Sequence, residues 1–375
     1  MDIVFLISHL PDPRYKKRFD TLSEQYKIAV IYWKKRVDNV KFSDIFIDNY
    51  EIAIKANQYS PFKRIPQWLE YGKKAISKMK QLHPKCIYVG NFDMLAIAEV
   101  YQKIVDPKVQ IIYEIADLHR YLVNDSKKIN NLILKRTLVA IEKCLLKKID
   151  LLVLTSMKFY EVYYSKWVDS DIVVLLPNMP NKDDFKDYKK VPHDNFTVGY
   201  VGTIRYKEQL KMLISAAKKA DVNVYFAGAS NEDDNEIEEL CKKNSDYCSF
   251  RGPYNYSKDI VDIYEKCNVI YSVYDASIPN VRVALPNKLY EALICELPII
   301  VAKETYLSEL VEEWGSGVSV TYNNIKELAD ILLKLKKDKI YYSEIVKNCR
   351  KSKSQANLSM YTEKFRARID EIIRN

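Results

Sequence analysis

Glycine is scarce in this chain, and the glycine motifs of two common nucleotide-binding classes are missing. Only 8 of the 375 residues are glycine, and the sequence contains neither GxGxxG nor GxxxxGK followed by Ser or Thr. These motifs bring backbone amides close to the phosphates of dinucleotides and nucleoside triphosphates. A dinucleotide-binding oxidoreductase and a P-loop ATPase therefore have no motif support.

Long apolar runs and paired cysteines are missing as well. The longest apolar runs, such as Ile172–Leu176 and Leu297–Ala302, are far shorter than the roughly 18 residues of a membrane-spanning helix. The sequence does not open on a secretory signal pattern, so we expect a cytoplasmic protein. Seven cysteines, an odd number, occur without a CxxC pair, which predicts reduced, buried thiols and no metal cluster.

Negative charge is too sparse in the first half to balance the positive charge there. Residues 1–190 hold 33 Lys and Arg against 23 Asp and Glu, whereas residues 191–375 hold 26 against 27. Each basic cluster alone is typical of a solvated helix face. Together they favour an anionic membrane surface or an anionic lipid-linked substrate, and no recognition motif indicates nucleic acid. The clusters, interleaved with apolar and aromatic residues, are Arg14–Arg18, Lys34–Arg36, Lys63–Lys80 and Lys127–Lys148.

Length and hydrophobic periodicity predict two α/β domains. A chain of 375 residues exceeds what one hydrophobic core usually supports. Short apolar runs alternate with helical patterns in both halves, which indicates parallel sheets covered by helices on both faces. The proline-containing, charged segment Pro177–Phe196 is the expected linker. The expected strands are 3–8, 28–33, 86–89, 110–115 and 151–155, then 197–201, 222–227, 269–273 and 298–302.

One carboxylate lies in unusually apolar surroundings. The run PNKLYEALICELPIIVA places Glu291 in an expected helix among Leu, Ala, Ile and Cys. A carboxylate there is either paired within the fold or ready for a ligand. Upstream, VGYVGTIRYK ends an expected strand in a glycine turn followed by cations, which suits a phosphate at the start of a helix. The two segments together predict a nucleotide site.

These segments resemble the retaining glycosyltransferases of family four, the glycosyl transferases group 1. The order of VGYVGTIR, VYFAG, FRGPY, NVRVALPNKLYEALICELPIIVA and SELVEEWGSGVSV carries the resemblance, and IIYEIADLH extends it loosely into the first half. The resemblance implies the GT-B architecture, two Rossmann-like, doubly wound parallel-sheet domains facing across a cleft. Residues 1–185 would bind the acceptor, residues 196–355 would bind the nucleotide sugar, and a final helix over 356–375 would pack back on the first domain.

The resemblance also implies site residues. Glu291 matches the glutamate that accepts hydrogen bonds from the donor's ribose hydroxyls. Arg205 and Lys207 follow the Gly202 turn, where the family places cations on the diphosphate, and the backbone amides of Gly202 to Ile204 would face the same anion. A solvated turn residue is the alternative reading for each cation. The other residues implied for the donor site are Thr203, Gly252, Tyr254, Asn280, Arg282, Asn287 and Lys288.

Two positions depart from the family pattern. Val283 occupies the place of a first glutamate eight residues before Glu291, and Ala116 replaces the histidine of a His-Asp pair. We expect Asp117, or His119 in place of the missing histidine, to orient the acceptor. These departures leave room for an inactive homologue.

The implied reaction is sugar transfer with retention of configuration. Arg205, Lys207 and Lys288 would stabilise the negative charge that develops on the leaving phosphate, so no side chain needs to attack. A UDP- or GDP-linked sugar would be the donor, with no other cofactor and no metal. The only DxD string, Asp169-Ser-Asp171, is interpreted as an incidental turn.

We therefore expect a hexosyltransferase-type enzyme, peripheral at the inner face of the plasma membrane. It would extend a lipid-linked saccharide for a bacterial surface polysaccharide such as a capsule. Two alternatives remain: a non-catalytic homologue that binds a partner enzyme or a glycan, and a nucleotide-sugar epimerase of related architecture.

Overall fold

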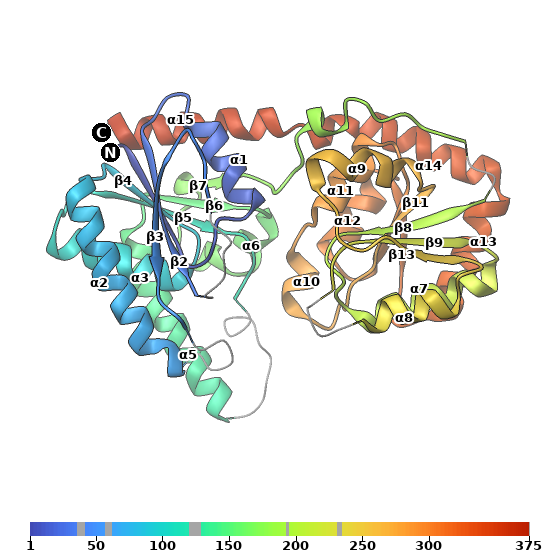
Figure 1. Cartoon of the computed structure of the whole chain (residues 1–375), viewed down its shortest axis with the longest axis horizontal. Coiled ribbons are helices and arrows are strands. Elements are labelled where there is room, and N and C mark those ends of the chain that lie inside the picture. Colours follow the sequence, from blue (N-terminus) through green and yellow to red (C-terminus); the bar gives the residue numbers. More distant parts are fainter. Residues whose placement is uncertain (36–41, 57–61, 120–128, 193–194, 231–234, 375) are drawn as a thin grey trace. The chain divides into compact units, whose positions relative to one another are not determined.

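The computed structural model describes residues 1–35, 42–56, 62–119, 129–192, 195–230 and 235–374. They form two compact units (Figure 1). The amino-terminal unit combines Met1–Pro177 with Ser359–Asn375, and the carboxy-terminal unit is Asn178–Leu358. No helix in the described part of the chain has both the length and the apolar character to cross a bilayer.

The amino-terminal unit is built on a seven-stranded sheet in the order β3-β2-β1-β4-β5-β6-β7. All pairings are parallel, and Phe5 of β1 aligns with Val30 of β2 on one side and Tyr88 of β4 on the other. The central strands are buried on both faces, which explains their unbroken apolar sequences. The strands are β1 (Ile3–Ile7), β2 (Ile28–Lys34), β3 (Asp48–Ala53), β4 (Cys86–Val89), β5 (Gln110–Ile115), β6 (Leu151–Leu154) and β7 (Val173–Leu175).

Helices cover both faces of this sheet. The last helix of the chain packs here, because the buried Phe365 meets the ring of Tyr88 edge-on and Arg366 donates to the carbonyl oxygen of Thr21 at 2.7 Å. The helices are α1 (Pro13–Leu22), α2 (Ile65–Leu82), α3 (Phe92–Ile104), α5 (Ile129–Leu145), α6 (Met157–Val162) and α15 (Leu358–Arg374).

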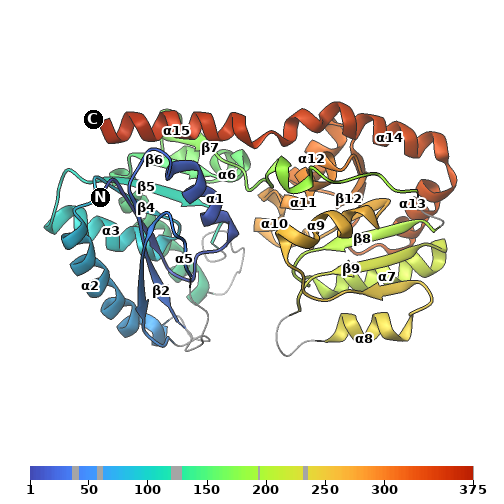
Figure 2. The ribbon, with the colours of Figure 1, turned by 45° about the horizontal axis from the view of Figure 1, so that its top comes forward.

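The carboxy-terminal unit has a six-stranded parallel sheet in the order β10-β9-β8-β11-β12-β13. Figure 2 shows α7 on one face of this sheet and α9 on the other. The strands are β8 (Thr197–Val201), β9 (Asn223–Ala227), β10 (Cys248–Phe250), β11 (Val269–Ser272), β12 (Ile299–Ala302) and β13 (Gly317–Val320). The helices are α7 (Lys207–Ala220), α8 (Glu236–Lys243), α9 (Tyr256–Glu265), α10 (Pro279–Val283), α11 (Asn287–Ile294), α12 (Tyr306–Glu313), α13 (Ile325–Lys337) and α14 (Lys339–Lys351).

The predicted fold class is confirmed: two doubly wound parallel sheets, each flanked by helices, form an α/β protein of two domains. The sequence-based strands omit β3, β7, β10 and β13, which are the four edge strands of the two sheets. Edge strands pair on one side only and bury less surface. In β3, DNYEIA contains no fully buried residue, so this strand lacks the apolar run by which the central strands are recognised.

Candidate functional site

The sheet of the carboxy-terminal unit reverses its direction of winding between β8 and β11. From β8 the chain proceeds outward through β9 to β10, whereas β11, β12 and β13 extend from the other side of β8. Ligands of doubly wound sheets bind outside the carboxyl ends of the strands at such a point. Gly202 follows β8 there, and Tyr274 follows β11 two residues after its end.

Three glycine turns lie together at the carboxyl ends of β8, β9 and β10. The N–H of Gly202 donates to Ala227 O at 2.8 Å, and that of Gly228 donates to Gly252 O at 2.9 Å. A Cβ on Gly228 would lie 1.8 Å from the carbonyl oxygen of Gly202. Glycine is therefore required at position 228 for the turns to approach, and Gly252 supports the turns through its carbonyl group.

Lys288, in the first turn of α11, reaches the Gly202 turn. Its ammonium donates to the Tyr274 hydroxyl at 3.0 Å, lies 4.6 Å from the ring centroid of Tyr200, and would be 3.2 Å from a Cβ on Gly202. Lys288 is only 9% exposed, and no carboxylate pairs with it within the described part of the chain. A buried cation without a counter-charge is costly, so this position favours an anionic ligand.

The other two predicted phosphate cations differ from Lys288 and from each other. Arg205 is exposed, three residues after Gly202. Lys207 begins α7 and forms an ion pair with Glu236 at 3.2 Å. Part of its charge is therefore neutralised within the unit, and Arg205 and Lys288 are the stronger candidates.

Two backbone amides of this turn already donate to other backbone carbonyl groups, which the sequence did not indicate. The N–H of Gly202 donates to Ala227 O, and that of Ile204 donates to Ala229 O at 2.9 Å. The expectation that the amides of residues 202–204 all face the diphosphate is therefore wrong for these two. Thr203 is exposed, and its amide remains the expected backbone contact of the diphosphate.

Glu291 is buried and is held by two tyrosines of α9 rather than by a cation. Oε1 accepts a hydrogen bond from Tyr256 Oη at 2.8 Å, and Oε2 accepts one from Tyr264 Oη at 2.5 Å. Burial and the charge of Glu291 raise the pKa of both phenols, so both remain donors. A carboxylate has about four acceptor positions, so Glu291 can still accept from two further hydroxyls.

Glu291 and Lys288 lie three residues apart in α11 and therefore share one face of that helix. Burial, and then the charge of Glu291, raises the pKa of the Tyr254 phenol. The sequence did not identify Tyr256 and Tyr264. Their spacing of eight residues, which places them on one face of a helix, was the signal that could have found them.

The remaining predicted donor residues lie on or beside the segment between β11 and α11. Arg282 is exposed on α10 and donates through Nε to Ala276 O at 2.7 Å, so it anchors the loop after β11. Asn280 is half-buried on α10, and Asn287 is half-buried at the start of α11. Val283 is buried, with 9% of its surface exposed.

Asp117 and His119 belong to the amino-terminal unit, where they follow β5 at exposed positions. His119 lies near Asp93 in the first turn of α3. Burial raises the pKa of the Asp93 carboxyl, while the charges of Lys35 and His119 act to lower it. The predicted acceptor residues therefore lie on the carboxyl edge of the first sheet, and the predicted donor residues lie in the other unit.

The DxD string lies in a capped turn, and most of the cysteines are buried. Asp169 accepts a hydrogen bond from the N–H of Asp171 at 3.2 Å and so caps a short helical turn. Six of the seven cysteines are buried, and Cys144 is exposed. Among the described residues, no group of three or more His, Cys, Asp or Glu side chains is arranged to hold a metal ion.

Comparison with known proteins identifies the family of the carboxy-terminal unit. Residues 181–352 match the family model described as glycosyl transferases group 1. The carboxy-terminal unit therefore belongs to the glycosyl transferases group 1 family. The chain is 21% identical to the succinoglycan biosynthesis protein ExoL of Rhizobium meliloti over 349 residues, which cover 88% of this chain and 84% of ExoL.

Solved structures share the fold of this chain over its whole length. Sucrose-phosphate synthase from Thermosynechococcus elongatus superposes with a TM-score of 0.74 at 17% identity, covering 100% of both chains. Anabaena HepE in complex with UDP and glucose gives 0.72 at 16% identity, covering 99% of this chain and 100% of HepE. The predicted GT-B architecture is thereby confirmed, and the match of residues 181–352 confirms the group 1 family for the carboxy-terminal unit.

Proposed function

We propose that the chain transfers a hexose, with retention of configuration, from a UDP- or GDP-linked donor to a lipid-linked saccharide of a bacterial surface polysaccharide. One observation carries the proposal. At the switch point of the carboxy-terminal sheet, the buried Lys288 ammonium lies against the Gly202 turn, and Glu291 occupies the same face of α11.

The donor would bind by its diphosphate and its ribose. Lys288 and the exposed Arg205 supply positive charge beside the Gly202 turn, and charge-assisted bonds to phosphate are roughly twice as strong as hydrogen bonds between neutral groups. Glu291, oriented by its two tyrosines, would accept from the vicinal ribose hydroxyls. The UDP in the HepE structure and the role of ExoL in succinoglycan synthesis support a nucleotide-sugar donor and a polysaccharide product.

The reaction replaces one bond at the anomeric carbon by another. The bond from this carbon to the diphosphate oxygen breaks, a bond to the acceptor oxygen forms on the same face, and the acceptor's proton passes to the departing phosphate oxygen. Lys288 and Arg205 would stabilise the charge on that oxygen, with a smaller contribution from Lys207. Asp117 or His119 would orient the acceptor, and no metal or further cofactor takes part.

A membrane-associated acceptor fits one helical face of the amino-terminal unit. Helices α2, α3 and α5 lie side by side on its sheet (Figure 1). They carry large exposed apolar side chains, including Ile133 at 59%, which is followed within three residues by Lys135 and Arg136. Apolar residues flanked by cations favour the surface of an anionic membrane. The exposed apolar residues are Ile65, Leu69, Val100, Ile104, Leu132, Ile133 and Ile141.

Binding to anionic liposomes tests this peripheral location. The intact chain should cosediment at low salt and be released as salt is raised, because screening weakens surface charge attraction. Replacing Ile133 by Ser and Lys135 by Glu together should reduce binding, while Lys242→Met on α8 of the other unit should not. Binding that ignores both salt and these replacements would contradict the location.

A panel of radiolabelled UDP- and GDP-sugars, with bacterial lipid extract as acceptor, tests the transfer. We expect one donor to release its nucleotide and label the lipid fraction, with activity unaffected by EDTA and an α-linked product from an α-linked donor. Arg205→Ala should lose most of kcat, whereas Glu291→Ala should mainly weaken donor binding. Tight nucleotide binding without turnover would instead indicate a non-catalytic homologue, and conversion of the donor without acceptor would indicate an epimerase.

A further inference from the structure

Two tyrosines hold the ammonium of Lys288, and a third packs against one of them. The ammonium lies 4.6 Å from the ring centroid of Tyr200 and 5.4 Å from that of Tyr274, and it donates to the Tyr274 hydroxyl at 3.0 Å. The ring of Tyr206 lies 5.1 Å from that of Tyr274. An aromatic face attracts a cation without neutralising it, so the charge of Lys288 remains available to an anion.

Tyr200 also fixes the turn after β8. Its hydroxyl donates to the carbonyl oxygen of Thr203 at 2.7 Å. Burial raises the pKa of this phenol, so the hydroxyl keeps the proton that it donates. The same peptide group carries the N–H of Ile204, which donates to Ala229 O at 2.9 Å. This peptide is therefore held at both ends, and the orientation of the preceding one, which carries the Thr203 amide, is restricted with it.

Tyr274 holds the ammonium from the other side of the switch point. Tyr200 lies in β8 and Tyr274 follows β11, and these are the neighbouring strands between which the sheet reverses. Burial raises the pKa of the Tyr274 phenol to about 12, so this hydroxyl is neutral when it accepts from Lys288. An ammonium has three N–H donors, and the bond to Tyr274 leaves two of them for a ligand.

These contacts order the Lys288 side chain before any nucleotide arrives. A long, flexible side chain that a ligand must immobilise on binding lowers the affinity by about two- to ten-fold. A lysine already held by a hydroxyl and two aromatic rings escapes most of this loss. Its ammonium would lie only 3.2 Å from a Cβ on Gly202, so one phosphate group can face both the ammonium and the adjacent Thr203 amide.

We propose that Tyr200 and Tyr274 are positioning residues of the donor site, which hold the Lys288 ammonium and the Thr203 amide ready for one phosphate group. This inference rests on the proposed function, because the phosphate is that of the nucleotide donor. It assigns a different role to each tyrosine. Tyr274 acts through the ammonium, and Tyr200 acts mainly through the turn.

Calorimetry with UDP or GDP, and with the matching nucleoside, tests the role of Tyr274. Tyr274→Phe should weaken nucleotide binding about five-fold and leave nucleoside binding unchanged, because one side chain near the phosphate is no longer ordered in advance. In a Lys288→Met background the same replacement should have no further effect, because the group that Tyr274 positions is gone. A purely structural tyrosine would weaken both ligands and would act equally in both backgrounds.

Tyr200→Phe tests the second role, because it keeps the ring beside the ammonium and removes only the bond to Thr203 O. Nucleotide binding should again weaken about five-fold, and this loss should persist in the Lys288→Met background. The matched control is Tyr342→Phe on α14, which removes a bond to Asn268 O of 2.9 Å. Asn268 precedes β11 at the opposite edge of the sheet, so neither ligand should be affected.

Three results would overturn the inference: equal losses for nucleotide and nucleoside, an unchanged nucleotide affinity in both tyrosine variants, or an undiminished effect of Tyr274→Phe in Lys288→Met. Melting temperatures show whether each variant is folded, and Tyr274 is only half-buried, so Tyr274→Phe decides even if Tyr200→Phe does not fold. The readout is binding and not turnover. A wild type that binds the nucleotide but transfers no sugar would refute the proposed reaction, while the variants still decide the roles of the tyrosines.

Discussion

Replacing Lys288 by Met tests the donor site without opening a hole in the fold. Met keeps the length and apolar stem of the side chain and removes only the ammonium that lies beside the Gly202 turn and the Tyr274 hydroxyl. If that ammonium faces the diphosphate, the replacement removes one charge-assisted contact with the donor.

The magnitude follows from the surroundings of the ammonium. Two unit charges 4 Å apart attract by ~4 kcal/mol at an effective dielectric of 20, and measured contributions of hydrogen bonds to charged groups are about 1.5–3 kcal/mol. Lys288 is buried, and removal of its ammonium leaves no carboxylate without a partner. We therefore use the measured range of about 1.5–3 kcal/mol. UDP or GDP binding should therefore weaken about 10- to 100-fold.

Calorimetry with paired ligands provides the assay. UDP should lose affinity for Lys288→Met, whereas uridine, which has no phosphate, should bind as it does to the wild type. The control Lys242→Met removes an exposed lysine of α8 and should change neither. Folding stability should stay equal or rise, because a buried cation has been removed. An unchanged UDP affinity, or equal losses for UDP and uridine, would refute the placement of the phosphate.

Three further predictions concern the surroundings of the two sites. Tyr264→Phe removes a hydrogen bond to the buried Glu291 and should lower the free energy of unfolding by about 1.5–3 kcal/mol in urea titrations, and it should also weaken uridine binding. Gly228→Ala forces a Cβ to 1.8 Å from the Gly202 carbonyl oxygen, so UDP binding should be lost together with about 1–3 kcal/mol of stability. Burial acts to raise the pKa of Glu114, but neighbouring guanidinium groups hold it below 4.5. Its contribution to stability should be complete above pH 4.5 and disappear as the pH falls further, so Glu114→Gln should show a flatter acid limb in urea titrations.

A specific result would contradict each of these three predictions. Uridine binding that is indifferent to Tyr264→Phe would show that Glu291 does not hold the ribose in the orientation its tyrosines impose. A Gly228→Ala variant with wild-type UDP affinity would mean that the glycine turns can separate without harm to the site. Equal acid sensitivity of Glu114→Gln and the wild type would assign the acid transition to other carboxylates.

The central elements of the fold were predictable from sequence because they are buried on both faces. An unbroken run such as that of β1 has no other stable place in an α/β protein. The edge strands were not predictable in this way. In β3, a polar, partly exposed sequence forms a strand because β2 offers its free edge, and this is a tertiary effect that no local pattern carries.

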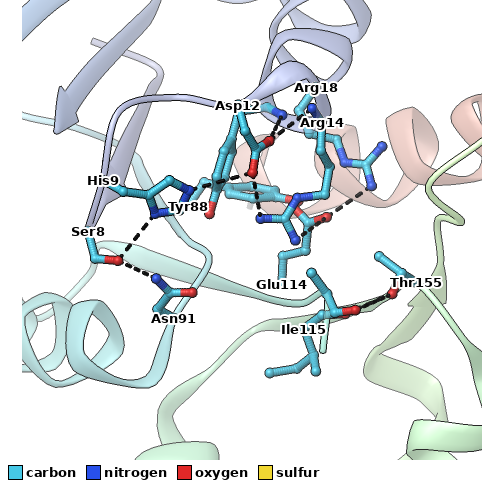
Figure 3. Close-up of polar contacts among 12 residues, drawn as sticks. Ser8, His9, Asp12, Arg14, Arg18, Tyr88, Asn91, Glu114, Ile115 and Thr155 are labelled. Atoms are coloured by element: carbon cyan, nitrogen blue, oxygen red, sulfur yellow. Dashed lines mark hydrogen bonds and ion pairs between the residues drawn. The ribbon is translucent and has the colours of Figure 1, made fainter. Parts of the chain in front are cut away.

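The residues of the proposed donor site could be predicted from the sequence, but the side chains that pair with them could not. Glu291 was noticed because a carboxylate in an apolar helix needs an explanation, but the sequence could not show that tyrosines of another helix satisfy it. The ion pair of Lys207 with Glu236 depends in the same way on a separate element. The hydrogen bond from the Asn91 amide to Ser8 Oγ (Figure 3) joins two loops that lie 83 residues apart in the sequence. Only the topology of the sheet brings these two loops together.

A crystal structure with UDP or GDP bound is the measurement that tests the central claim most directly. We expect the β-phosphate within hydrogen-bonding distance of the Lys288 ammonium and the Thr203 amide, and the ribose hydroxyls on the carboxylate of Glu291. A nucleotide bound elsewhere, with Glu291 still engaged only by Tyr256 and Tyr264, would contradict the account.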